Sequence, residues 1–234
     1  GSWAEEMKTI TKEVRNEKDN FHTCLFGCVY DFVVETARTV ILESNAQTPY
    51  IVGMNCKIHG SKVDGIVLTD RLVSPLPADE VDEVSQKISD LILEEVPDGA
   101  TIQLGLGKVS TAIGYGLKTK NDLGIFSELL SEPMVQLMQS GNVTNTKKGY
   151  MDGVSVFAFS LGSKEMYDYM DKNPQFWNGT FPFVNDPRNI AKNKMFSIAS
   201  VATMIACIFL FGVFYALIAN ANELMQNVEE SLPI

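Results

Sequence analysis

The residues best suited to chemistry are two glycines that lie between an expected strand and an expected helix. A short buried strand is expected over residues 101–104, Gly105 and Gly107 follow at once, and a helix is expected over residues 110–117. Glycines let a ligand approach the backbone closely, and the N–H groups at the start of a helix favour an anion or an oxyanion. The turn is not the full dinucleotide-binding fingerprint, because Ser110 stands where a third glycine is needed. A tight strand-to-helix connection without a ligand is the alternative interpretation.

The other ionisable side chains fit structural roles better than catalytic ones. His22 and His59 are isolated in the sequence, which favours a surface position or a hydrogen-bonded position in the core. Glu128 and Glu132 are spaced to share one face of a helix, yet neither has a nearby base or metal ligand in the sequence. These residues therefore predict packing or solvated charge, and no catalytic residue is assigned.

Bulk composition excludes some classes of partner and site. The net charge of −10 leaves no basic surplus to neutralise phosphates, which argues against a nucleic-acid partner. The four cysteines fit no zinc pattern, so we expect no metal site. A disulfide between Cys24 and Cys28 is one alternative, and free buried thiols in a reducing compartment are the other. The chain begins without an initiator methionine, so a cleaved targeting segment is left open.

Strands and helices alternate along most of the chain. Amphipathic spacing predicts helices over residues 31–43 and 79–95. The second helix is expected to turn five apolar side chains inward: Val81, Val84, Ile88, Leu91 and Ile92. Further strands are expected at residues 50–54, 63–69 and 154–159, and further helices at 135–139 and 164–170. This alternation predicts an α/β fold with a mainly parallel sheet.

A long apolar run lies near the carboxyl end. Residues 195–222 contain no charged side chain, and about 20 apolar residues in a helix span the hydrocarbon core of a bilayer. Arg188, Lys192 and Lys194 precede the run, so the positive-inside rule predicts that the preceding domain lies on the cytoplasmic or matrix side. A buried core helix is the alternative. The predicted division is an N-terminal extension (1–20), an α/β domain (21–194), a single transmembrane helix (195–222) and an acidic tail (223–234).

Several ordered motifs resemble one enzyme family. The motifs are Pro97-Asp-Gly-Ala-Thr-Ile-Gln-Leu-Gly-Leu-Gly107, Lys120-Asn-Asp-Leu-Gly124, Gly141-Asn-Val-Thr-Asn145, Leu161-Gly-Ser-Lys-Glu-Met-Tyr-Asp168 and Phe183-Val-Asn-Asp-Pro-Arg-Asn-Ile-Ala191. Together they resemble the N-terminal half of the acetyl-CoA hydrolase/transferase family, which includes 4-hydroxybutyrate and butyryl-CoA:acetate CoA-transferases. The resemblance implies two similar α/β halves that face each other across a cleft. It also implies that Gly105 and Gly107 lie near the acyl-CoA, and that a glutamate in the second half attacks the thioester.

The sequence departs from the family pattern where the chemistry is done. By spacing, the place of the nucleophilic glutamate falls near residues 212–214, inside the predicted transmembrane helix. Ser110 replaces a family proline, a family His-Thr-Glu reads Phe-Ser-Glu at 126–128, and a family Asp-Gly reads Glu-Pro at 132–133. These departures predict a cleft that lacks one wall and part of its polar equipment.

The resulting expectation is a membrane-anchored, non-catalytic, CoA-transferase-like accessory or structural subunit of a larger membrane complex. Its expected partners are membrane lipid and other subunits of that complex, and no cofactor is required. A mitochondrial respiratory or ATP-synthase complex in the inner membrane follows from family analogy alone. Two alternatives remain at this point. The chain could be one half of a split acyl-CoA:carboxylate CoA-transferase or acyl-CoA hydrolase, or a module that retains CoA at Gly105 and Gly107.

Overall fold

The computed structural model describes residues 15–17, 20–23, 25–27, 30–54, 56–76 and 78–192. They belong to one compact unit, and residues 194–234 lie outside the described part. Within the described ranges, no helix has the length and hydrophobicity needed to cross a bilayer. The expected transmembrane helix (195–222) and acidic tail (223–234) lie outside these ranges.

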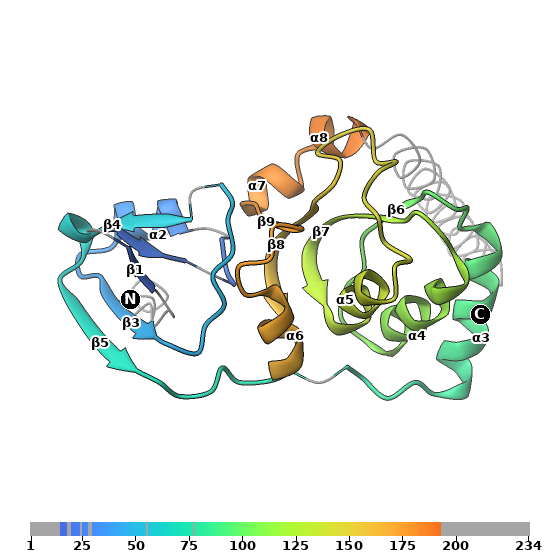
Figure 1. Ribbon diagram of the computed structural model, residues 1–234, viewed down its shortest axis with the longest axis horizontal. Helices are drawn as coiled ribbons and strands as arrows, with labels where there is room; N and C mark the ends of the chain where they lie inside the picture. The colour runs from blue at the N-terminus through green and yellow to red at the C-terminus, as the bar shows by residue number, and fades with distance from the viewer. Residues whose placement is uncertain are drawn as a thin grey trace, which may run out of the picture. The chain divides into compact units, whose positions relative to one another are not determined.

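A parallel four-stranded sheet forms the centre of the unit (Figure 1). Its strands, in spatial order, are β6 (Thr101–Ile102), β7 (Gly124–Ser131), β8 (Ser155–Leu161) and β9 (Phe176–Asn178). All three pairings are parallel, with Ile102 opposite Ile125 and Ser131 opposite Leu161. Helices connect successive strands, as parallel pairing requires: α4 (Lys108–Gly116), α5 (Glu132–Gln139) and α6 (Lys164–Met170). The predicted α/β fold with a mainly parallel sheet is confirmed.

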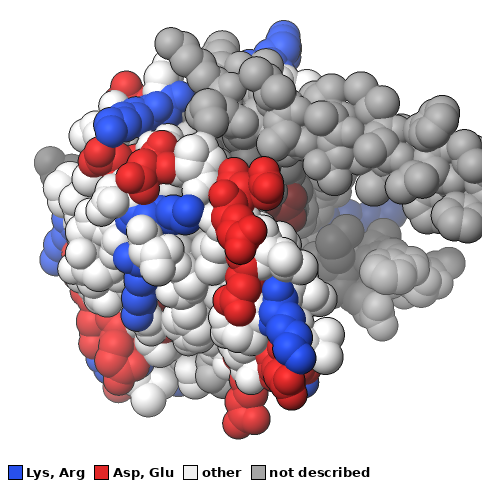
Figure 2. Space-filling model, turned by 90° about the vertical axis from the view of Figure 1, so that its right-hand side faces the viewer, with Lys and Arg blue, Asp and Glu red and all other residues white. Residues whose placement is uncertain are grey.

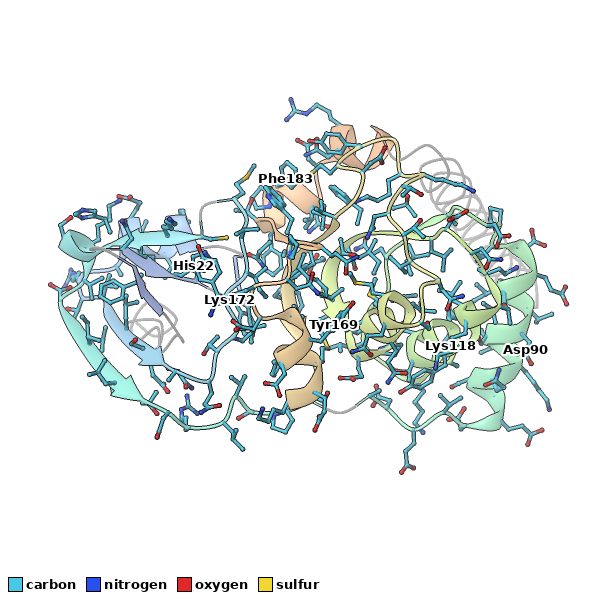
Figure 3. The ribbon with its side chains drawn as sticks, in the orientation of Figure 1. His22, Asp90, Lys118, Tyr169, Lys172 and Phe183 are labelled. Carbon is cyan, nitrogen blue, oxygen red and sulfur yellow. The ribbon has the colours of Figure 1, made fainter. Side chains whose placement is uncertain are left out.

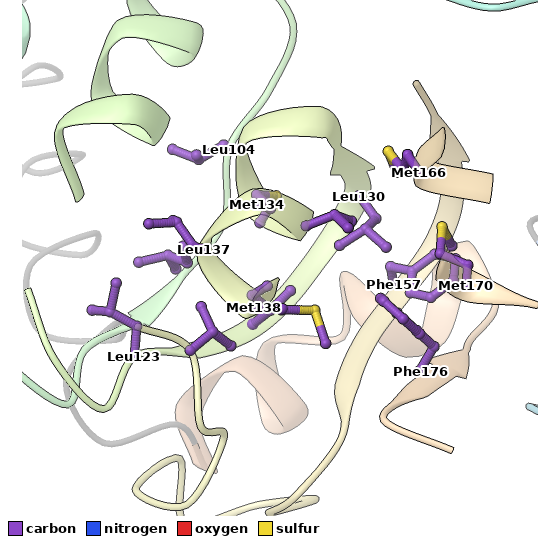
Figure 4. Close-up of a cluster of buried hydrophobic side chains, with 14 of the residues drawn as sticks. Leu104, Leu123, Leu130, Met134, Leu137, Met138, Phe157, Met166, Met170 and Phe176 are labelled. Atoms are coloured by element: carbon purple, nitrogen blue, oxygen red, sulfur yellow. The ribbon is translucent and has the colours of Figure 1, made fainter. Parts of the chain in front are cut away.

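Alternating strand residues bury both faces of this sheet. Ile125 and Phe157 belong to the larger core, together with side chains of α5 and α6. The close-up in Figure 4 shows Phe157 beside Met170 of α6. The adjacent strand residues Phe126 and Val156 pack on the opposite face, which α7 (Phe181–Val184) covers through Val184. Two-sided burial explains why β8 is a nearly continuous apolar run. The last described helix is α8 (Pro187–Lys192).

The described chain before β6 builds two smaller sheets, two α-helices and a short 3-10 turn. β1 (Arg15–Glu17), β2 (Asn20–His22) and β4 (Lys57–His59) form an antiparallel sheet, and β1 falls within the predicted N-terminal extension. β3 (Ile41–Asn45) pairs in parallel with β5 (Gly65–Thr69). The helical elements are α2 (Tyr30–Thr36), the short 3-10 turn Gly60–Lys62, and α3 (Glu83–Glu95), which packs on α4.

Asn178 joins this N-terminal part to the central sheet. Its backbone N–H donates to the Val52 carbonyl (2.8 Å), and its own carbonyl accepts from the Met54 N–H (2.8 Å). These bonds form a parallel bridge between Gly53 and Asn178 at the outer edge of β9. A Cβ atom on Gly53 would lie 1.9 Å from the Asn178 carbonyl oxygen, so only glycine fits there. Asn178 is fully buried, and its side chain also donates to the Ala158 carbonyl (3.2 Å).

Three expectations about local structure were wrong. The helix predicted over residues 31–43 ends at Thr36, and its last residues belong to β3, because pairing with β5 outweighs helical spacing there. Residues 50–54 are extended but form only the bridge at Gly53 rather than a strand. The helix predicted over residues 79–95 is α3, which begins only at Glu83, and four of the five side chains expected to face inward are exposed: Val84, Ile88, Leu91 and Ile92. The fifth, Val81, precedes the helix and is half-buried. Ser85 and Ser89 are buried instead.

Two polar side chains hold the amino ends of β7 and β8 together. Asn145 Oδ1 accepts from the Ile125 N–H (2.9 Å), and Asn145 Nδ2 donates to Ser155 Oγ (2.9 Å). Asn145 has a φ of +57°, a conformation that asparagine tolerates better than most residues. Lys148 is 1% exposed, and its Nζ donates to the carbonyls of Val154 (2.6 Å) and Ile125 (3.2 Å). Burial lowers the Lys148 pKa to about 8, although nearby Asp152 opposes the shift.

We predict that Asn145→Ala lowers the free energy of unfolding by about 2 kcal/mol, because the buried Ile125 N–H loses its acceptor. Urea unfolding followed by tryptophan fluorescence measures the change. Asn121→Ala is the matched control, since the Asn121 side chain makes only an exposed 3.4 Å contact with Asp98. Equal effects of the two substitutions would contradict a role for Asn145 in joining the strands.

Lys148 is expected to make stability depend on alkaline pH. Because its pKa falls from 10.5 to about 8 on folding, the unfolded chain binds more protons between these values, and stability rises with pH across that window. The free energy of unfolding of wild type should therefore rise by about 3 kcal/mol relative to that of Lys148→Met from pH 7.5 to 10.5. The control is Lys147→Met, since Lys147 is exposed and pairs with Asp122 (2.6 Å). Parallel pH curves for wild type and Lys148→Met would refute the prediction.

Candidate functional site

The Gly105–Gly107 turn opens onto a pocket at the carboxyl ends of the parallel strands. The pocket has a volume of about 390 Å³. Gly105 and Gly107 follow β6, Ser131 ends β7 and Leu161 ends β8, so three neighbouring strands contribute to it. Ligands of open α/β sheets commonly bind outside this edge of the strands. The other lining residues are Leu76, Ala78, Asp79, Leu106, Thr111, Glu132 and Pro133.

Both candidate glycines leave their backbone accessible. Gly107 has a φ of +114°, which a side chain would strain, and a Cβ atom there would meet no other atom within 4 Å. A Cβ atom on Gly105 would meet only Ser110 Oγ, at 3.9 Å. The pocket therefore has room for a ligand beside this backbone. The structure places the two predicted residues together, and their role in binding stays a prediction.

The helices that follow the strands begin at the pocket. Gly107 is the N-cap of α4 and Ser131 that of α5, and neither helix has a side-chain hydrogen bond at its cap. The first N–H groups of α4 can therefore serve an oxygen acceptor, whereas the first turn of α5 offers fewer because Pro133 has no N–H. Close packing holds α4 in place, since a Cβ atom on Gly114 would lie 2.6 Å from Pro133 Cβ.

Glu132 is a pocket residue that sequence reasoning missed. The glutamate lies in the first turn of α5, and its Oε2 accepts from the Ser163 N–H (2.8 Å) at the start of α6. Glu128, its supposed partner, lies in β7 and accepts from Asn185 Nδ2 (2.7 Å). The spacing suggested one helix because the strand β7 was not recognised. A recognised β7 would have placed Glu132 at the carboxyl end of a parallel strand.

Asp79 and Glu132 are the ionisable residues that line the pocket, and no lysine, arginine or histidine is among the described residues around it. The nearest element with a lysine is the start of α4, where Lys108 Nζ contacts Asp82 Oδ2 (3.2 Å). The pocket thus combines apolar walls, free N–H groups and carboxylates. Such a site suits an uncharged ligand group with a carbonyl oxygen better than it suits a phosphate or a carboxylate of the ligand.

The remaining candidates from the sequence have structural roles. His22 is buried and packs against Tyr50, with ring centroids 4.3 Å apart and ring planes tilted by 37°; its position is labelled in Figure 3. His59 Nδ1 accepts from the Ser61 N–H (3.2 Å). Cys56 is buried, and its Sγ contacts the Met54 carbonyl (3.5 Å), while Cys24 and Cys28 lie outside the described residues. In the described part of the chain, no cluster of three or more potential metal ligands occurs.

Comparisons with known proteins agree with this architecture. No protein-family model matches the chain. The chain is 36% identical over 178 residues to succinyl-CoA:cyclohexane-1-carboxylate CoA transferase of Geobacter metallireducens, covering 76% of this chain and 40% of that protein. Identity to 4-hydroxybutyrate coenzyme A transferase of Clostridium kluyveri is 34% over 189 residues, covering 79% of this chain and 44% of that protein.

Solved structures give the same result. The fold matches RipA from Yersinia pestis with a TM-score of 0.73 and 34% identity, over 79% of this chain and 43% of that one. The chain spans about two-fifths of the length of the curated relatives that it matches. Through this shared stretch, the chain belongs to the CoA-transferase family that includes the 4-hydroxybutyrate and butyryl-CoA:acetate enzymes.

Proposed function

We propose that the described domain binds the thioester end of an acyl-CoA at the Gly105–Gly107 pocket, as one lobe of a CoA-transferase-type site. The observation that carries the proposal is the open pocket at the ends of β6, β7 and β8, where no side chain fills the space beside either glycine. Family membership supports the same ligand class, since the matched relatives are named as CoA-transferases.

The lining favours an uncharged acyl group. Leu76, Leu106 and Leu161 offer apolar contact, and the N–H groups at the starts of α4 and α5 can donate to a thioester carbonyl oxygen. A dicarboxylic acyl group such as succinyl would bring a second carboxylate towards Asp79 and Glu132. Repulsion from like charges at the rim of such a pocket is worth about 1 kcal/mol, or roughly fivefold in affinity.

Calorimetric titration of the full chain in nonionic detergent with CoA, butyryl-CoA and succinyl-CoA tests this proposal. We expect butyryl-CoA to bind most tightly. Gly105→Val should weaken its binding by about tenfold or more, because the new side chain enters the pocket without a strained φ. Gly65→Val is the control, since Gly65 in β5 has similarly open surroundings. Failure of all three ligands to bind wild type, or equal affinities of both variants, would refute the proposal.

A second candidate concerns the role of the whole chain, and residues 195–222 favour it, because this run of the sequence contains no charged side chain. We infer a membrane-anchored, non-catalytic accessory subunit whose α/β domain lies on the cytoplasmic or matrix side, with the mitochondrial inner membrane as one placement. The split-enzyme alternative differs in one respect, namely that another chain brings a carboxylate nucleophile to the bound thioester. Sustained acyl exchange by the purified complex would favour that alternative.

The anchoring prediction is tested by alkaline carbonate extraction of membranes from cells that express the chain. The full chain should stay in the membrane pellet, because transfer of about 20 apolar residues into lipid is strongly favourable. A variant lacking residues 195–222 serves as the control and should be released. Release of both proteins, or retention of both, would contradict a membrane anchor at this position.

A further inference from the structure

One face of α3 is apolar and exposed. Val84, Ile88, Leu91 and Ile92, which we call the α3 stripe, follow the spacing that places side chains on one side of a helix. Val84 and Leu91 are 66% and 68% exposed, and Ile88 and Ile92 are 39% and 38% exposed. Four apolar side chains in one row form a patch rather than the scattered exposure that is ordinary for single residues.

The α3 stripe is not needed to hold α3 on its own domain. The inner side of the helix carries Ser85 and Ser89, which are buried, and Leu93, which packs against the larger core. A Cβ atom on Gly116 would lie 2.2 Å from Leu93 Cδ1, so α3 and the end of α4 are in close contact. The α3 stripe therefore faces away from the side of the helix that packs against α4 and the core.

Acidic residues surround the α3 stripe. Residues 78–95 contain seven acidic side chains and one lysine, Lys87, which pairs with Glu83 (2.7 Å). Ser85 and Lys108 lower the pKa of Asp82 to about 2, the backbone N–H of Ser85 making the largest contribution, so this group also stays charged. Figure 2 looks at the side of the domain where α3 lies and shows a row of acidic side chains beside uncharged surface. Asp90 lies on the outer side of the helix (Figure 3).

The charge at the end of α3 is itself unfavourable. Glu94 and Glu95 occupy its last turn, which contains no basic residue. Carboxylates at this position face the negative end of the helix dipole. Lysine or arginine from a partner would neutralise the carboxylates of the last turn and would also interact favourably with the negative end of the helix dipole. A second copy of α3 would instead bring further acidic groups.

We propose that the α3 stripe binds an amphipathic helix of another polypeptide whose apolar face is flanked by lysine or arginine. An apolar seam with complementary charges at its edges is the arrangement by which helices recognise helical partners. The same charges disfavour self-association through α3 and adsorption to anionic lipid. This surface is separate from the Gly105–Gly107 pocket, so the proposal does not depend on acyl-CoA binding.

The test uses the full chain in nonionic detergent and a labelled synthetic helix of 18 residues with leucines on one face and lysines on the other. Fluorescence anisotropy should detect binding to wild type. The double variant Val84→Gln/Leu91→Gln and the double variant Glu94→Lys/Glu95→Lys should each weaken it by about tenfold or more. Leu68→Gln is the control, since Leu68 is an 81% exposed leucine in β5.

A second peptide with glutamates in place of the lysines separates charge recognition from simple hydrophobic adsorption. This peptide should bind wild type poorly and bind Glu94→Lys/Glu95→Lys more tightly. Equal unfolding midpoints would show that the variants remain folded. The proposal fails if wild type does not bind the lysine peptide at about 0.1 mM. It also fails if Leu68→Gln weakens binding as much as the α3 variants do. Sedimentation that shows wild type to self-associate and the α3 variants not to do so would likewise contradict it.

Discussion

The parallel pairing of β6, β7 and β8 is the constraint on which the rest of the domain depends. Parallel strands bring all their carboxyl ends to one edge and require a long connection back to the opposite edge. In this chain the connections are α4 and α5, so the starts of these helices meet at the edge where the strands end. The pocket beside Gly105 and Gly107 follows from this geometry together with the open backbone of the two glycines.

The amino ends of the same strands show how the parallel pairing is maintained. Buried polar groups at the starts of β7 and β8 have to find partners, since an unpaired group in the core costs more than a bond contributes. Asn145 meets this demand by linking the Ile125 N–H to the Ser155 hydroxyl, and Lys148 does so by linking the Ile125 carbonyl to that of Val154, just before β8. Side chains therefore close the amino ends of the strands, and the carboxyl ends are left open to a ligand.

The sequence predicted the elements whose hydrophobic period was clear. The helix at residues 164–170 and the strand at residues 63–69 agree with α6 and β5, and the Gly105–Gly107 turn lies where expected. β7 was missed because Ser127 and Glu128 interrupt its apolar run, although Ser127 is buried and Glu128 binds Asn185 at the surface. Glu132 was consequently overlooked as a pocket residue. In α3, helical spacing identified the apolar side chains, but spacing alone does not reveal whether other parts of the chain bury them.

The junction at Asn178 has a consequence for how the domain can be divided. Residues 52–54 occupy the outer hydrogen-bonding edge of β9, so that edge is not available to another strand. An uncovered strand edge next to apolar residues such as Phe176 is a template for aggregation. A fragment cut immediately before β6 would thus keep the whole parallel sheet and lose the cover that keeps it soluble. Any shortened version of this protein has to retain the segment around Gly53, even though that segment contributes no strand of its own.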